Sequence, residues 1–132
     1  MSQDLKAFLR GNAKPLTNIR YVASDRFTDA DGKPIEWELR PVTTPENDAL
    51  MKQARRGEVD NSEIALKLAV MATVFPDLKN TELQESYGVV GEEELLQALL
   101  AVPGEYYDYL AKVQSFMGYD KKPEERIEEA KN

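Results

Sequence analysis

The sequence predicts an α+β protein that is mostly α, with an N-terminal β-hairpin packed on a bundle of about four to five helices. Two observations predict this class. Before residue 43, apolar and polar residues alternate in two stretches, as they do in half-buried strands. After residue 43, apolar residues recur at helical spacing between Pro and Gly residues that start and stop helices. We expect one globular domain over residues 1–119 and a charged, flexible tail over residues 120–132.

Residues 1–18 are expected to form an N-terminal arm that contains a short helix. Leu5, Phe8 and Leu9 have the i, i+3, i+4 spacing of one helical face. So short a helix is marginal in water, and its apolar stripe must therefore dock on the protein's own core or on a neighbouring molecule.

The hairpin is expected over residues 19–42. Its strands are predicted over residues 19–27 and 35–42, and Trp37 and Leu39 lie on the apolar face of the second strand. Asp and Gly residues between the strands are typical of a turn. Because two strands are not stable alone, the face that carries the only Trp should pack on helices.

The helical part is expected over residues 44–119. Its first helix begins after a Thr cap, with Pro at the first helical position and acids in the first turn. Its second helix is apolar almost all round and should be the central, most buried one. The expected helices cover residues 44–56, 61–75, 81–87, 92–102 and 105–117.

The composition excludes several functional classes. The 132-residue chain has no His and no Cys, which removes imidazole bases, thiol nucleophiles, disulfides and thiolate zinc sites. The absence of a signal peptide and of any apolar run near the ~20 residues that a bilayer requires predicts a cytoplasmic protein. The net charge of −7 argues against binding to nucleic acid or to a membrane surface.

Three motifs suggest ligand sites, and each has a plainer structural interpretation. Residues 29–32 resemble part of a calcium loop but lack its first oxygen ligand and flanking helices, so they are predicted to form a turn. Residues 88–91 have the GXXG spacing of some nucleic-acid-binding loops, but the glutamates that follow would repel phosphate. Those glutamates, residues 92–94, suit a helix N-terminus better than a magnesium site. We assign no catalytic, cofactor-binding or metal-binding residue.

Tyrosines and a few exposed apolar residues are the candidates for a protein interface. The tyrosines are dense for a chain of this length, and tyrosine is enriched at interfaces. Tyr107 lies off the helical stripe that contains Tyr106 and Tyr109, so one of the two faces should point outward, with core packing as the alternative. The interface candidates are Leu5, Phe8, Leu9, Tyr87, Val89, Val90, Tyr106, Tyr107 and Tyr109.

Seven segments, in their order along the chain, carry a family resemblance. They are residues 5–14 (LKAFLRGNAK), 21–27 (YVASDRF), 31–38 (DGKPIEWE), 75–78 (FPDL), 83–91 (LQESYGVVG), 94–96 (ELL) and 129–132 (EAKN). Together they resemble the XkdN-like tail assembly chaperones of tailed phages and prophages.

This resemblance implies a non-enzymatic assembly factor without cofactors that works in the host cytoplasm and is absent from the mature virion. Its implied partners are the tape measure protein, which it would keep soluble, and the tail tube protein, whose subunits it would help recruit. The resemblance also implies self-association, with the N-terminal amphipathic segment as the candidate contact. A small acidic protein with apolar grooves suits such a role, because it can cover exposed apolar helices.

The resemblance further implies a longer product made by programmed frameshifting near the end of the reading frame. Ala130, Lys131 and Asn132 can be encoded by GCA-AAA-AAC, which contains the slippery heptamer A-AAA-AAC. We expect the gene to carry this heptamer. An ordinary polar terminus is the alternative.

Two functions from other classes compete with this interpretation. An acidic inhibitor, DNA mimic or adaptor that binds a basic partner needs acids along one face, whereas acids here cluster at helix starts and turns. A carboxylate-dependent hydrolase needs two acids that converge in a pocket, and the sequence identifies no such pair.

Overall fold

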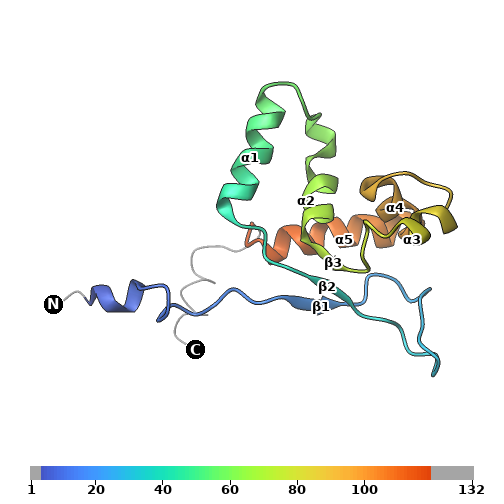
Figure 1. Cartoon of the computed structure of the whole chain (residues 1–132), viewed down its shortest axis with the longest axis horizontal. Coiled ribbons are helices and arrows are strands. Elements are labelled where there is room, and N and C mark those ends of the chain that lie inside the picture. The colour runs from blue at the N-terminus through green and yellow to red at the C-terminus, as the bar shows by residue number, and fades with distance from the viewer. Residues whose placement is uncertain (1–3, 120–132) are drawn as a thin grey trace.

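The computed structural model describes residues 4–119, so the tail predicted over residues 120–132 lies outside the described residues. The described part is an α+β fold that is mostly α, which confirms the predicted class (Figure 1). In chain order its elements are η1 (Leu5–Phe8), β1 (Ile19–Tyr21), β2 (Trp37–Leu39), α1 (Thr44–Arg55), η2 (Asn61–Glu63), α2 (Ile64–Ala72), β3 (Thr73–Phe75), α3 (Thr81–Ser86), α4 (Glu92–Leu99) and α5 (Pro103–Phe116), where η marks a 3-10 helix.

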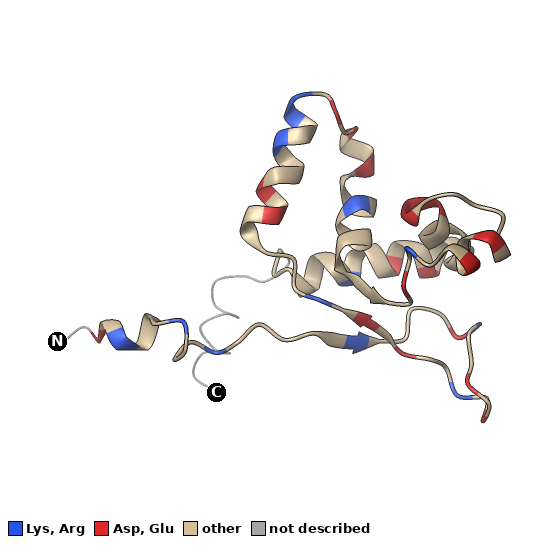
Figure 2. Ribbon diagram, in the orientation of Figure 1, with Lys and Arg blue, Asp and Glu red and all other residues tan. Residues whose placement is uncertain are grey.

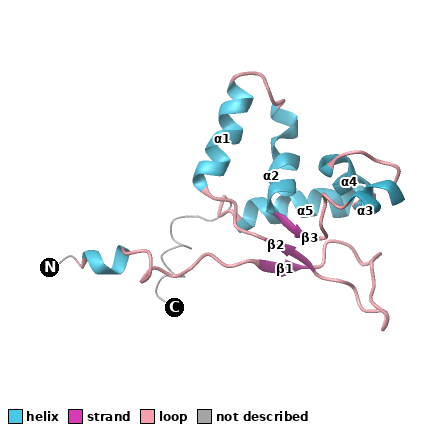
Figure 3. Ribbon diagram, in the orientation of Figure 1, coloured by secondary structure: helices cyan, strands magenta, loops and turns pink. Residues whose placement is uncertain are grey.

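The predicted N-terminal hairpin is present and packs on helices. Strands β1 and β2 are antiparallel, with Tyr21 opposite Trp37 and Ile19 opposite Leu39. Trp37 and Leu39 are 2% and 0% exposed, so the apolar face predicted from the alternation is the buried face. Figure 3 shows the helices gathered on one side of this short sheet.

A third strand, β3, pairs with β2 where the sequence predicted the end of a helix. The helix α2 ends at Ala72, and Thr73 then lies opposite Leu39 in the antiparallel β2–β3 pair. The prediction of a helix to residue 75 was wrong for its last three residues. A short apolar run fits either a helix or a buried strand, and the β-branched Thr73 and Val74 favour the strand once β2 is available to pair.

Both hairpin strands are shorter than predicted because the connection between them leaves the sheet. It closes on itself instead, since the Ile35 N–H donates to the Phe27 carbonyl at 2.8 Å. The turn at its tip is held by Asp29, whose carboxylate accepts from the N–H groups of Asp31 and Lys33 at 2.8 and 3.0 Å. This is the turn geometry expected for residues 29–32 rather than a calcium loop.

The first helix, α1, starts as its sequence predicts. Pro45 lies in the first turn, and the Glu46 carboxylate accepts from the Thr43 N–H and hydroxyl at 3.0 and 3.1 Å. The same carboxylate receives two hydrogen bonds from the Arg40 guanidinium, at 2.9 and 2.7 Å. Arg40 first, and then the Thr43 N–H, hold the pKa of Glu46 at about 2, below its usual 4.5.

The core lies between the sheet and the helices and is centred on α2 and α5. Helix α2 contacts α1, α4 and α5, as predicted for the central helix. From α5, Tyr109 is 0% exposed and meets Trp37 edge to face with ring centroids 5.1 Å apart. The hydroxyl groups of Tyr109 and Thr73 are 2.6 Å apart, so α5 is hydrogen-bonded to the start of β3.

Helices α4 and α5 differ from the prediction at their boundaries. Helix α4 ends at Leu99 instead of residue 102, and α5 begins at Pro103 instead of residue 105. Proline is compatible with the first turn of a helix because its missing N–H would have no partner there. Within residues 4–119, no helix has the length and apolar character required to cross a bilayer.

Candidate functional site

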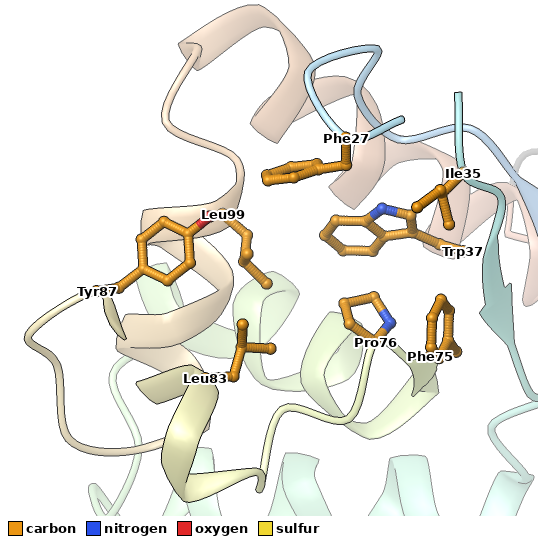
Figure 4. Close-up of a pocket in the computed structure, with 8 residues that line it drawn as sticks. All are labelled: Phe27, Ile35, Trp37, Phe75, Pro76, Leu83, Tyr87 and Leu99. Atoms are coloured by element: carbon orange, nitrogen blue, oxygen red, sulfur yellow. The ribbon is translucent and has the colours of Figure 1, made fainter. Parts of the chain in front are cut away.

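An apolar pocket opens beside the sheet, between the hairpin connection and helices α3 and α4 (Figure 4). Its volume is about 150 Å³. We call it the apolar pocket hereafter. It is lined by Phe27, Ile35, Trp37, Phe75, Pro76, Leu83, Tyr87 and Leu99. Only the Trp37 indole and the Tyr87 hydroxyl carry a polar side-chain atom, so this surface is suited to apolar side chains of a ligand.

Four separate segments build the walls of this pocket. The hydrogen bond that closes the hairpin connection brings Phe27 beside Ile35. Leu83 and Tyr87 are four residues apart and therefore lie on one face of α3 and its C-cap. The Asn80 side chain accepts from the Leu83 N–H at 2.8 Å, which stabilises the first turn of this short helix.

The position of Trp37 is set by packing behind the pocket. Its ring contacts Tyr109, whose own ring stacks on Tyr21 with centroids 6.2 Å apart. The Thr73 hydroxyl donates its single proton to the Ala69 carbonyl at 2.7 Å, so Tyr109 is the donor in the Tyr109–Thr73 hydrogen bond. Burial raises the pKa of Tyr109 to about 12, and the hydroxyl therefore stays neutral in its structural role.

Carboxylates outnumber cations around the apolar pocket. Glu82 and Glu85 are exposed on α3, the helix that supplies Leu83. Asp29, Glu36 and Glu38 line an adjoining depression that shares Ile35 and Phe75 with the pocket, together with the cations Arg20 and Lys33. Arg26 lies near Phe27, with its guanidinium 5.6 Å from the ring centroid. Figure 2 shows the acidic residues on α3, α4 and the hairpin side of the molecule.

The N-terminal arm, residues 4–18, is a second candidate surface. It extends away from the rest of the molecule, and every residue in it is exposed (Figure 1). Leu5, Phe8 and Leu9 are 75%, 81% and 59% exposed, so the described fold gives their stripe no core of its own to dock on. Asp4 caps the short helix, by accepting from the Lys6 N–H at 3.0 Å.

The remaining interface candidates are placed in different environments. Tyr87 lines the apolar pocket, while Val89 is half-buried against the core. Val90 and Tyr107 are 85% and 66% exposed. Tyr106 is half-buried, with its ring edge to face with that of Tyr107.

Tyr109 is a core residue, which is the alternative that the sequence left open for the tyrosines. It is 0% exposed and its ring contacts Tyr21 and Trp37 of the sheet, so it offers no surface to a partner in this fold. Tyr109 does not line the pocket itself, but it contacts Trp37, which does.

The other motifs form local structure in the described residues. Gly88 and Gly91 have φ angles of +67° and +106° at the end of α3 and the start of α4, which is a helix joint that glycine permits. Glu93 pairs with Lys67 of α2, and Glu94 accepts from the Val90 N–H at 3.3 Å. Across residues 4–119, no group of three or more acidic side chains is arranged to hold a metal ion.

Seven pocket residues were absent from the interface candidates drawn from the sequence. They are Phe27, Ile35, Trp37, Phe75, Pro76, Leu83 and Leu99. Each was interpreted as an ordinary core or boundary residue, because periodicity within one element does not reveal which residues of different elements meet. The presence of Phe75 and Pro76 immediately after a helix was the one available signal, since this pair cannot continue the helix and must be placed elsewhere.

Comparisons with known proteins give one consistent result. The family model described as phage XkdN-like tail assembly chaperone protein matches residues 5–131. Phage-like element PBSX protein XkdN of Bacillus subtilis (strain 168) is 30% identical, over 98% of this chain and 94% of that protein. The uncharacterized protein YqbN of the same organism is also 30% identical, over 98% and 93%. The crystal structure of YqbN superposes with a TM-score of 0.82 at 30% identity, covering 91% of this chain and 100% of that chain.

Proposed function

Because this chain belongs to the phage XkdN-like tail assembly chaperone family, we propose that it binds the tape measure protein and keeps it soluble during tail assembly. We further propose that this chain helps recruit tail tube subunits around the tape measure protein. It does so as a binding protein, without catalysis or a cofactor, in the host cytoplasm, and it is absent from the finished virion.

The apolar pocket is the observation that carries this proposal. A tape measure protein that is not yet enclosed by the tube would expose apolar helix faces, and such a face presents side chains at i, i+3 and i+4. A pocket walled by Leu83, Phe75 and Trp37 can bury one of these side chains. The net charge of −7 keeps a complex with an apolar client away from charge neutrality, which favours its solubility.

Trp37 makes the pocket measurable, because it is the only Trp in the chain and lines the pocket wall. Segments of the tape measure protein that bind there should change the fluorescence of Trp37 in a saturable titration. Tyr87→Ser removes an aromatic wall of the pocket and should weaken this binding about tenfold or more, as expected for the loss of a buried aromatic contact. Tyr119→Ser, on an exposed ring that neither lines the pocket nor belongs to the interface candidates, is the matched control and should bind as the unchanged chain does.

Co-expression tests the role in assembly. The tape measure protein should remain in the soluble fraction with the unchanged chain and with Tyr119→Ser, and should precipitate with Tyr87→Ser. A tape measure protein that is equally soluble without this chain would refute the proposal. Capture of a nuclease or polymerase, with no tape measure binding, would favour the acidic DNA mimic instead.

The tail tube and virion parts of the proposal have their own tests. Tail tube subunits should be retained by the immobilised chain more strongly when the tape measure protein is present than when it is absent. Mass spectrometry of purified virions should detect tube and tape measure peptides without peptides of this chain. Equal retention of tube subunits with and without the tape measure protein would contradict the recruitment of tube subunits. Peptides of this chain in virions would contradict its absence from the finished virion.

The frameshift product is proposed separately, because residues 130–132 lie outside the described residues. The nucleotide sequence should contain A-AAA-AAC at the codons for these residues. Synonymous recoding of the heptamer should abolish a minor, longer product on an immunoblot, and an unchanged product ratio would exclude the slippage.

A further inference from the structure

We infer that the N-terminal arm of one copy of this chain inserts Phe8 into the apolar pocket of a second copy. The pocket is then covered by an arm until a client displaces it. The exchange with a client depends on the proposed function, whereas the insertion of the arm does not.

The apolar side chains of the arm have no binding site within their own described fold. Phe8 is 81% exposed, and Leu16, farther along the arm, is 75% exposed. The arm nevertheless has a defined local shape, because the Asn12 side chain donates to the Lys6 carbonyl at 2.8 Å and the Leu9 N–H donates to the same carbonyl at 3.1 Å. A short, hydrogen-bonded segment with its apolar side chains in water gains stability when they are buried elsewhere.

The apolar pocket has the size and chemistry for one aromatic ring. Its volume is about 150 Å³, and an apolar cavity of about this volume is large enough to bind benzene. Leu83, Phe75 and Leu99 would contact the ring of Phe8 from separate segments.

Charge favours the same pairing. The arm carries Lys6, Arg10 and Lys14 against the single acid Asp4. On the pocket side, α3 exposes two glutamates, and acids outnumber cations in the adjoining depression. A basic arm is therefore attracted to the pocket of another copy, although the net charge of the chain is negative.

The direction of the arm favours a second copy over its own pocket. The arm leaves β1 at the Ile19 end of the strand, whereas the pocket lies beyond the other end, where the chain continues to Phe27. The Asn18 side chain donates to the Glu38 carboxylate at 2.7 Å, which anchors the base of the arm. In Figure 1 the arm and α3 lie at opposite ends of the molecule.

Disulfide trapping tests the contact directly, since the chain has no cysteine of its own. A chain with Ala7→Cys, which keeps Phe8, is mixed under mild oxidation with a tagged chain that carries Ser86→Cys, an exposed position beside Tyr87 at the end of α3. The matched control replaces the tagged partner with Gln53→Cys, at an exposed site on α1 far from the pocket. We expect a disulfide-linked heterodimer with Ser86→Cys in severalfold excess over the control.

Two results would overturn the inference. One is equal trapping by the two partners. The other is a chain with both Ala7→Cys and Ser86→Cys that closes on itself at the monomer mass of 14.9 kDa, independently of concentration. That result would assign the pocket to the arm of the same chain.

Sedimentation velocity gives an independent measurement with the unmodified pocket. Phe8→Ser should weaken self-association about tenfold or more, the effect expected for the loss of one buried Phe side chain. Ala7→Ser, at the neighbouring exposed position, is the control and should associate as the unchanged chain does. Unchanged association of Phe8→Ser would contradict the inference.

The two proposals fail separately. Phe8→Ser keeps the whole pocket, so it should still bind segments of the tape measure protein, with higher apparent affinity because no arm competes. Loss of client binding by every variant would refute the proposed function alone, provided the disulfide and sedimentation results hold. Client binding that is unaffected by Phe8→Ser would contradict competition between arm and client.

Discussion

The N-terminal arm and the aromatic wall, formed by Trp37 and Tyr109, both contain large apolar side chains, which are exposed in the arm and buried in the wall. In the wall, Trp37 and Tyr109 are at most 2% exposed and contact each other. In the arm, Leu5 and Phe8 are at least 75% exposed and rest on nothing within the described fold. The comparison separates two groups of apolar residues. Those of the aromatic wall stabilise the fold, and those of the arm are exposed and available for association.

The strongest test of this comparison is Trp37→Ala. The indole fills space between the sheet and α5, and its loss leaves a cavity that the surrounding residues cannot close. We expect the free energy of unfolding to fall by about 3–5 kcal/mol. Urea denaturation followed by circular dichroism measures it, and Tyr107→Ala, on an exposed ring, should change it by less than about 0.5 kcal/mol. If Trp37→Ala lowered the free energy of unfolding by less than about 1 kcal/mol, the close packing of Trp37 would be contradicted.

A smaller effect is expected for Tyr109→Phe, which keeps the ring and removes its hydrogen bond to Thr73. The loss should be about 1 kcal/mol at neutral pH. Because burial raises the pKa of Tyr109 from 10 to about 12, its neutral form stabilises the fold below pH 10, and this contribution is lost as pH rises toward 12. The advantage of the unchanged chain over Tyr109→Phe should therefore shrink between pH 10 and 12. Chemical denaturation across that range measures the difference, and a constant difference would exclude the linkage.

Glu46→Gln tests a local interaction at the start of α1, outside the aromatic wall. It should lower the free energy of unfolding by about 0.5–1 kcal/mol at pH 7, through the loss of the exposed ion pair with Arg40 and of the negative charge at the helix N-terminus, since the Gln side chain can still accept from the Thr43 N–H. The folded-state pKa of Glu46 is about 2, against 4.5 when unperturbed, so this contribution is complete above pH 4.5 and is lost as pH falls toward 2.

The control for Glu46→Gln is Asp48→Asn, which removes a charge near the same helix end where the structure shows no ion pair like that of Glu46 with Arg40. Its effect should be smaller, because only the interaction with the helix dipole is lost. Thermal denaturation of both variants between pH 2 and 7 measures this. Equal effects of the two substitutions would assign the stabilisation to charge alone.

The smallest effect on stability is expected in the arm. Phe8→Ser should change the free energy of unfolding by less than about 0.5 kcal/mol in dilute solution, since the side chain contacts no core residue. Denaturation at a concentration where the chain is monomeric measures this. A loss comparable to that of Trp37→Ala would show that the arm packs on its own fold, and the contrast between the two regions would disappear.

Local signals in the sequence were enough to predict the hairpin and the start of α1. The alternation around Trp37 identified the buried face, and Thr43, Pro45 and Glu46 identified the helix start, because these signals depend on neighbouring residues. Family membership, expected from the order of seven segments, is confirmed by the match over residues 5–131. Apolar spacing alone could not separate the end of α2 from β3, since the strand forms only where β2 offers a partner.

The candidate site could be predicted only in part. Tyr87 and the arm residues Leu5, Phe8 and Leu9 were selected from the sequence. The distinction between exposed Tyr107 and buried Tyr109 was left open there, because both lie on one amphipathic helix and only the packing of α5 on the sheet separates them.

By itself, the amino-acid sequence determined the fold class, the starts of α1, α3 and α4, the absence of His and Cys chemistry, and the family. These properties depend on composition and on residues close together in the chain. The tertiary structure alone decided that β3 completes the sheet, that Tyr109 is buried and that Phe27, Phe75 and Leu83 meet in one pocket. The reason is physical, because strand pairing and side-chain burial join segments that are far apart in the chain, such as those of Phe27 and Leu99, and no local periodicity records which segments will meet.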